Sequence, residues 1–250
     1  MSSSTILKLL PFGLSAIGVA AGYTYVNKDT IFMSTKTNKD GKLIWISGRS
    51  GSGKSTTGDI LHQKYGFTHY ECDSFIFHHD PFSGPMYKTG EKPVLEGISI
   101  EQKKICKRIT TEGYIPLITG RSNPPDFSIF SDFYNLACNN ILEEKEKRGR
   151  DGKHWAITNA LYTRACRDYV RSKLGEDSLI IVSLELPDEL AIDRMATRAG
   201  VPESAKHNFK KYLHGYDAIA DDEPNTLQIK VNPETTQDDV CQQIIQYLDK

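Results

Sequence analysis

The segment GRSGSGKST, residues 48–56, decides the fold. It satisfies the pattern G-x-x-x-x-G-K-[ST] and follows LIWIS, residues 43–47, a short apolar run typical of a strand buried on both faces. A helical pattern over residues 57–65 comes next, so strand, loop and helix occur in the order that supports this motif. The sequence therefore predicts a phosphate-binding loop between a buried strand and a helix.

The residue types in this loop suit a nucleoside triphosphate and Mg²⁺. Glycines let successive backbone N–H groups turn toward an anion, and the following helix adds unpaired N–H donors at its positive end. Lys54 supplies a charge for the β- and γ-phosphates, and the Ser55 hydroxyl is a hard oxygen ligand for Mg²⁺. The predicted phosphate-binding residues are Gly48, Ser50, Gly51, Ser52, Gly53, Lys54, Ser55 and Thr56.

Composition excludes several classes of protein. The 250 residues are 38% apolar and 25% charged, which excludes a multi-span membrane protein, a collagen-like chain and a highly charged disordered tail. A formal net charge of −1 argues against a dedicated nucleic-acid binder, because such proteins need a basic excess. The 5 cysteines are odd in number and widely spaced, so a reducing compartment is favoured over a disulfide framework or a zinc site.

An acidic residue, Asp73, follows the second strand candidate, residues 68–72. At the carboxyl end of a strand beside the phosphate site, a carboxylate can accept the proton of an attacking hydroxyl or orient Mg²⁺ through water. The alternative is an Asp that caps the next helix or turn. Position alone does not decide between these two roles.

Four further stretches match the patterns of one family. Cys72-Asp73 stands where that family has Gly-Asp, and MYKTGEKP, residues 86–93, is similar to its K-M-x-x-G-x-P-L. NALYTRACRDYVR, residues 159–171, is similar to S-A-L-K-R-x-Y-R-D-x-L-R, and RMATRAG, residues 194–200, has the spacing of the lid pattern R-x-x-x-R-x-G. Together with the loop, these stretches resemble small P-loop sugar-acid kinases of the gluconokinase type, relatives of shikimate and nucleoside monophosphate kinases.

The resemblance covers most of residues 43–249, in patches, and implies both a fold and an activity. The implied fold is an α/β P-loop NTPase, a parallel sheet of about five strands with helices on both faces. The implied activity is an ATP- and Mg²⁺-dependent kinase that phosphorylates a hydroxyl of a small molecule such as gluconate. On this view Lys54, Asp73, Arg194 and Arg198 are catalytic, and Ser55 and Asp73 serve the metal.

The arginines are candidates for contact with phosphate or substrate. Arg194 and Arg198 are four residues apart and share one helix face, which suits a transferring phosphoryl group. The alternative is a solvated face on which nearby acids, Asp188, Glu189 and Asp193, pair with them. The other predicted substrate-binding residues, beside Asp73, follow strand candidates at the edge where α/β sheets bind ligands, and are Arg121, Arg164 and Arg167.

The sequence departs from the family pattern where the acceptor would bind. Ser74 replaces a second acid, the D-x-D-R segment is replaced near residues 96–99, and Val201-Pro202 replaces His-Phe. A nucleoside or nucleoside monophosphate kinase is therefore one alternative function. A membrane-tethered nucleotide-binding protein without transfer activity is another.

The strand candidates span residues 43–47, 68–72, 114–118, 154–158 and 179–185. A sixth candidate, residues 226–231, precedes a final amphipathic helix over residues 238–248. All of these lie in a predicted kinase domain, residues 43–250.

The N-terminus differs from this domain. Residues 9–26 are 18 residues without a charge, near the short limit of roughly 17–25 for a membrane span. We expect a single-pass anchor within residues 1–28, followed by a polar linker over residues 29–42, with the kinase domain on the cytosolic face or in the mitochondrion. The alternatives are a secretory signal, a mitochondrial targeting segment or a buried helix of a cytoplasmic protein.

Overall fold

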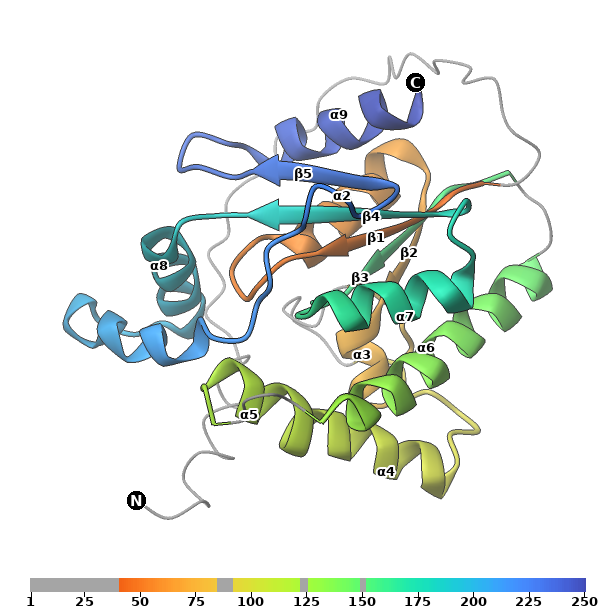
Figure 1. The fold of residues 1–250 in the computed structure, drawn as a ribbon, viewed down its shortest axis with the longest axis horizontal. Coiled ribbons are helices and arrows are strands. Elements are labelled where there is room, and N and C mark those ends of the chain that lie inside the picture. Colours follow the sequence, from red (N-terminus) through yellow and green to blue (C-terminus); the bar gives the residue numbers. More distant parts are fainter. Residues whose placement is uncertain (1–40, 85–91, 122–125, 149–151) are drawn as a thin grey trace.

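The computed structural model describes residues 41–84, 92–121, 126–148 and 152–250. Its centre is a five-stranded, all-parallel sheet with the strand order β2-β3-β1-β4-β5 (Figure 1). The strands are β1 (Leu43–Ser47), β2 (Thr68–Glu71), β3 (Trp155–Thr158), β4 (Leu179–Glu185) and β5 (Thr226–Lys230). Every residue of β1, in the middle of the sheet, is buried, as its continuous apolar run predicts.

Alternation of side chains along β1 divides the core into two layers. Leu43 and Trp45 pack on the side of α6 (Phe127–Arg148) and α7 (Arg164–Leu174). Ile44 and Ile46 pack on the opposite side, which is covered by α2 (Lys54–Tyr65) and α9 (Gln237–Leu248). Figure 1 shows these helix pairs on the two faces of the sheet. The predicted α/β fold with helices on both faces is confirmed.

The predicted strand over residues 114–118 is wrong. After α4 (Ile100–Arg108), the chain forms a π-helical segment, Ile109–Tyr114, which continues into the short helix α5 (Ile115–Ile118). Ile109, Gly113 and Leu117 are buried at intervals of four, which is a helical period. Pro116, which has no backbone N–H, is the second residue of α5, where the π-helical segment passes into the α-helix. The sixth candidate, not this segment, supplies the fifth strand, β5.

The remaining elements lie near the carboxyl ends of the strands. α3 (Cys72–Ile76) follows β2 without a loop, and α8 (Asp188–Ala199) follows β4. α8 leads into a 3₁₀ segment, Glu203–Tyr212, with which it projects beyond the strand ends (Figure 1). In parallel sheets this edge is where ligands bind.

Within the described ranges, no helix has the length and apolar character needed to cross a bilayer. The predicted anchor in residues 1–28 and the linker up to residue 40 lie outside those ranges. So do most residues of the family-like stretch 86–93.

Candidate active site

A cavity of about 540 Å³ lies at the carboxyl edge of the sheet. The loop after β1, the first turn of α3, the lid helix α8 and the start of α9 enclose it. Its lining contains most of the residues singled out in the sequence, together with three that were not, and consists of Ser50, Gly51, Gly53, Lys54, Ser55, Thr56, Asp73, Arg194, Arg198, Thr235, Thr236 and Gln237. The structure therefore brings the predicted phosphate loop, Asp73 and both lid arginines to one site.

The backbone of the loop is shaped for close approach to an anion. Gly51 and Gly53 have φ values of 83° and 96°, a region that favours glycine. A Cβ atom on Gly51 would lie 2.9 Å from the carbonyl oxygen of Ala191 in α8. Gly53 is the N-cap of α2, and no side chain of the described residues caps this helix end. The first-turn N–H groups of α2 are thus left for an anionic ligand.

Lys54 is the cation at the centre of this loop. Its Nζ donates to the carbonyl oxygen of Arg49 at 3.0 Å. Burial lowers the pKa of Lys54 to about 8, although the nearby carboxylates of Asp73 and Glu71 favour the charged form. A phosphate beside Nζ would add negative charge and raise this pKa again, because an opposite charge stabilises the ammonium.

Asp73 lies in the first turn of α3 with its side chain exposed in the cavity. Asn159 Nδ2 donates to its Oδ1 at 3.3 Å. Desolvation raises the pKa of Asp73, while the charges of Lys54 and Arg198 and the hydrogen bond from Asn159 act in the opposite direction. The N-cap of α3 is Glu71, whose side chain accepts from the Asp73 backbone N–H. The capping role considered for Asp73 therefore belongs to Glu71.

Glu71, which the sequence analysis missed, forms an acidic pair with Asp73. It is the last residue of β2 and only 1% exposed. Burial raises the pKa of Glu71 well above its usual range, and the charge of Asp73 raises it further. A signal in the sequence could have identified Glu71. Two acids, Glu71 and Asp73, stand at alternate positions where a strand ends, about twenty residues after the loop.

These acids and the loop hydroxyl fit a magnesium ion. Glu71 Oε2 is buried and has no hydrogen-bond partner among the described residues. Ser55 and Asp73 line the same cavity and offer further hard oxygens. No cluster of three or more His, Cys, Asp or Glu side chains suited to a metal occurs in the described part of the chain. This set suits Mg²⁺, which takes one or two carboxylates and completes its shell with water and phosphate oxygens.

The lid arginines are not paired with the acids that could have neutralised them. Arg194 Nη1 donates to the carbonyl oxygen of Gly51 at 3.4 Å, and Arg198 lines the cavity. Asp188 instead pairs with Arg49 at 2.7 Å, and Asp193 pairs with Lys206 at 2.8 Å. The guanidinium groups of α8 thus lie at the cavity beside the phosphate loop.

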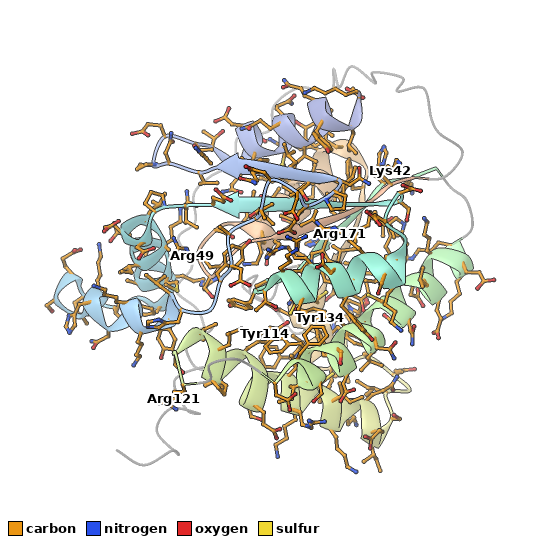
Figure 2. All side chains as sticks on the ribbon, viewed as in Figure 1. Lys42, Arg49, Tyr114, Arg121, Tyr134 and Arg171 are labelled. Carbon is orange, nitrogen blue, oxygen red and sulfur yellow. The ribbon has the colours of Figure 1, made fainter. Side chains whose placement is uncertain are left out.

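Three further arginines were predicted to bind substrate. Among the residues that the structure describes, the lining of this cavity does not include them. Arg167 is fully buried and binds Glu223 through two hydrogen bonds of 2.8 and 2.7 Å. Arg164 is exposed and pairs with Asp222 at 2.8 Å. Arg121 is exposed and lies shortly after the last residue of α5 (Figure 2). Ion pairs within the protein explain Arg164 and Arg167 without a substrate.

Comparison with known proteins gives a likeness of fold. No family model and no curated protein sequence matches the chain. A gluconokinase from Sinorhizobium meliloti 1021 has a TM-score of 0.50 at 18% identity, covering 83% of this chain and 91% of its own. A sugar kinase from Janibacter sp. HTCC2649 has a TM-score of 0.50 at 19% identity, covering 84% and 95%.

A shikimate kinase from Acinetobacter baumannii has a TM-score of 0.43 at 16% identity, covering 84% of this chain and 94% of its own. Identities this low concern the fold alone. The first two structures therefore support the fold as a whole, whose centre here is the five-stranded parallel sheet. The chain has the α/β fold of the P-loop NTPases.

Proposed function

We propose that this protein is an ATP-dependent kinase that transfers the γ-phosphoryl group to a hydroxyl of a small molecule. The observation that carries the proposal is the single cavity in which the phosphate loop, Asp73 and two lid arginines meet. The likeness to a gluconokinase and a sugar kinase supports the same class.

Each cavity residue has a distinct task in this transfer. The N–H groups of the loop and Lys54 hold the phosphates of ATP, and Lys54 with Arg194 and Arg198 stabilises the charge that spreads over the transferring group. Ser55 and the buried Glu71 would hold Mg²⁺, with Asp73 orienting it through water, and the ion when bound neutralises phosphate charge.

Asp73 acts as the base. It accepts the proton of the acceptor hydroxyl as that oxygen bonds to the γ-phosphorus and the bond to the β-phosphate oxygen breaks. The products are the phosphorylated acceptor and ADP. Desolvation raises the pKa of Asp73, and the positive charges of Lys54 and Arg198 oppose this and favour the ionised form that the role needs.

A sugar acid such as gluconate is the first acceptor to test, because the lid and the segment 159–171 resemble sugar-acid kinases. The residues that would hold the sugar acid differ, with Ser74 in place of an acid. A nucleoside or nucleoside monophosphate is therefore the second class of acceptor.

The test is ADP release by the full chain with ATP, Mg²⁺ and a panel of sugar acids, nucleosides and nucleoside monophosphates. We expect release that depends on one acceptor class and is lost when Mg²⁺ is chelated. ATP binding with no acceptor-dependent release across the panel would contradict the proposal. That result would favour a nucleotide-binding protein without transfer activity.

A further inference from the structure

Asp73 is connected to the protein interior by a chain of hydrogen bonds. Asn159 Nδ2 donates to Asp73 Oδ1 at 3.3 Å, and Tyr114 Oη donates to Asn159 Oδ1 at 2.8 Å. Tyr134 Oη lies 3.2 Å from Tyr114 Oη and 3.4 Å from Asn159 Oδ1. Asp73, Tyr114 and Tyr134 come from three separate helical segments and Asn159 follows β3, and Figure 2 shows Tyr114 and Tyr134 side by side below α7.

Asn159 is held so that only one orientation of its amide fits. It is 3% exposed, its backbone N–H donates to Ile46 O at 3.3 Å, and its backbone oxygen accepts from Trp45 Nε1 at 3.3 Å. An ionised carboxylate only accepts hydrogen bonds, so the amide nitrogen must face Asp73 and the amide oxygen must face the phenols. The residue after β3 is thereby anchored to the central strand β1.

Tyr114 keeps the amide in this orientation. It ends the π-helical segment, a wide helical turn often found at functional sites. Its ring contacts Phe130 and Tyr162, with centroids 5.7 and 5.6 Å away. Its hydroxyl makes the shorter of the two phenol hydrogen bonds to Asn159 Oδ1, 2.8 Å against 3.4 Å from Tyr134, so its removal would hold the amide less firmly.

We propose that Asn159 is a positioning residue for Asp73 and that Tyr114 fixes the Asn159 amide. The inference rests on the proposed function, in which Asp73 is the base. The hydrogen bond from Asn159 Nδ2 fixes the direction of the accepting oxygen of Asp73. This orientation serves proton transfer and is not needed to bind ATP.

The chain contains a matched control for Tyr114. Tyr70 Oη donates to Asn140 Oδ1 at 2.8 Å, the same bond at the same length as that from Tyr114 to Asn159. Tyr70 is fully buried, and the hydrogen bonds of the described residues do not connect its partner to Asp73. Tyr70→Phe therefore shows how much stability is lost with such a hydrogen bond, while the orientation of Asp73 is left unchanged.

The experiment compares Tyr114→Phe with Tyr70→Phe in the full chain, using the acceptor that the wild type phosphorylates. We expect Tyr114→Phe to lower kcat on the order of tenfold to a hundredfold, with the KM for ATP within about twofold. A loss confined to kcat separates a misplaced carboxylate from a general loss of structure, which would also change the KM for ATP. Tyr70→Phe should lower the Tm similarly and leave kcat and the KM for ATP unchanged.

Asn159→Ala should lower kcat by more than Tyr114→Phe does, again with little change in the KM for ATP, because it removes the donor itself. If Asn159→Ala does not fold, the pair of tyrosine variants decides alone. A wild-type kcat in Tyr114→Phe would overturn the inference. A wild type that phosphorylates no acceptor would instead overturn the proposed function, so the two failures are distinguishable.

Discussion

The phosphate side and the acceptor side of the cavity are built in different ways. The phosphate side consists of residues 48–56, one continuous stretch whose backbone N–H groups and Lys54 would contact the phosphates of ATP. On the acceptor side, Asp73 depends on Asn159, 86 residues away, and Asn159 depends on Tyr114, 45 residues away. A local motif can therefore specify nucleotide binding, whereas the chemistry at the acceptor needs the whole fold.

The largest expected effect is that of Asp73→Asn, on the acceptor side. The amide keeps the size of the side chain but cannot accept a proton, so transfer should fall by roughly 10²–10⁴-fold. ATP affinity should change little, and the free energy of unfolding should stay within about 1 kcal/mol, because Glu71 and not Asp73 caps α3. Turnover, calorimetric ATP binding and Tm measure the three quantities. Retained transfer would remove Asp73 from the chemistry.

Arg167→Ala tests whether Arg167, which the sequence analysis predicted to bind substrate, instead stabilises the fold through its buried ion pair with Glu223. Removal of the guanidinium leaves Glu223 as a buried charge with fewer partners, which should cost about 3–5 kcal/mol of unfolding free energy. Arg164→Ala is the control, because its exposed pair with Asp222 should contribute no more than about 1 kcal/mol. Urea denaturation measures both. Equal, small losses would contradict the structural role of Arg167.

Lys54→Ala tests the phosphate side. Loss of one preorganised charge beside the transferring group should lower turnover by roughly 10²–10³-fold and leave the fold intact. Lys64→Ala is a control on the same helix, because that exposed lysine pairs with Asp238 at 2.7 Å at the far end of α2. Steady-state kinetics of the two variants separate the roles. Equal rates in both would remove the loop from the mechanism.

A smaller effect should appear in the pH dependence of stability. Burial raises the folded-state pKa of Glu71 above its usual value of 4.5, so the folded protein binds more protons than the unfolded chain above that pH. This group therefore stabilises the fold less as pH rises through its folded-state pKa. In Glu71→Gln that contribution should vanish, and denaturation between pH 5 and pH 9 should give a flatter curve than the wild type. Parallel curves would contradict the raised pKa.

The strand, the loop and the helix of residues 43–65 could be predicted from the sequence, because a contiguous motif flanked by apolar periodicity determines the local structure. The sequence also located Asp73 and the lid pair, since the end of a strand and a spacing of four along a helix are local features. Arg167 shows what such local features cannot predict. Its position after β3 favoured a substrate contact, but its partner Glu223 lies 56 residues away and only the fold brings them together.

The strand prediction for residues 114–118 failed for a related reason. A short apolar run with β-branched residues fits a strand or a buried helix equally well, and packing decides between them. Here the run continues a helical segment that buries Ile109, Gly113 and Leu117. The same helix carries Tyr114 to Asn159, so the local error also concealed the support of Asp73. Glu71 and Gln237 were missed because neither belongs to a known motif.

The most informative measurement follows the terminal phosphoryl group itself. The full chain is incubated with γ-labelled ATP, Mg²⁺ and the acceptor panel, with Lys54→Ala and Asp73→Asn in parallel, and products are separated by chromatography. We predict label on one small-molecule acceptor in the wild type and almost none in either variant, while Asp73→Asn still binds ATP. Label found only in inorganic phosphate, or none released at all by the wild type, would contradict a kinase in which the two sides of this cavity act together.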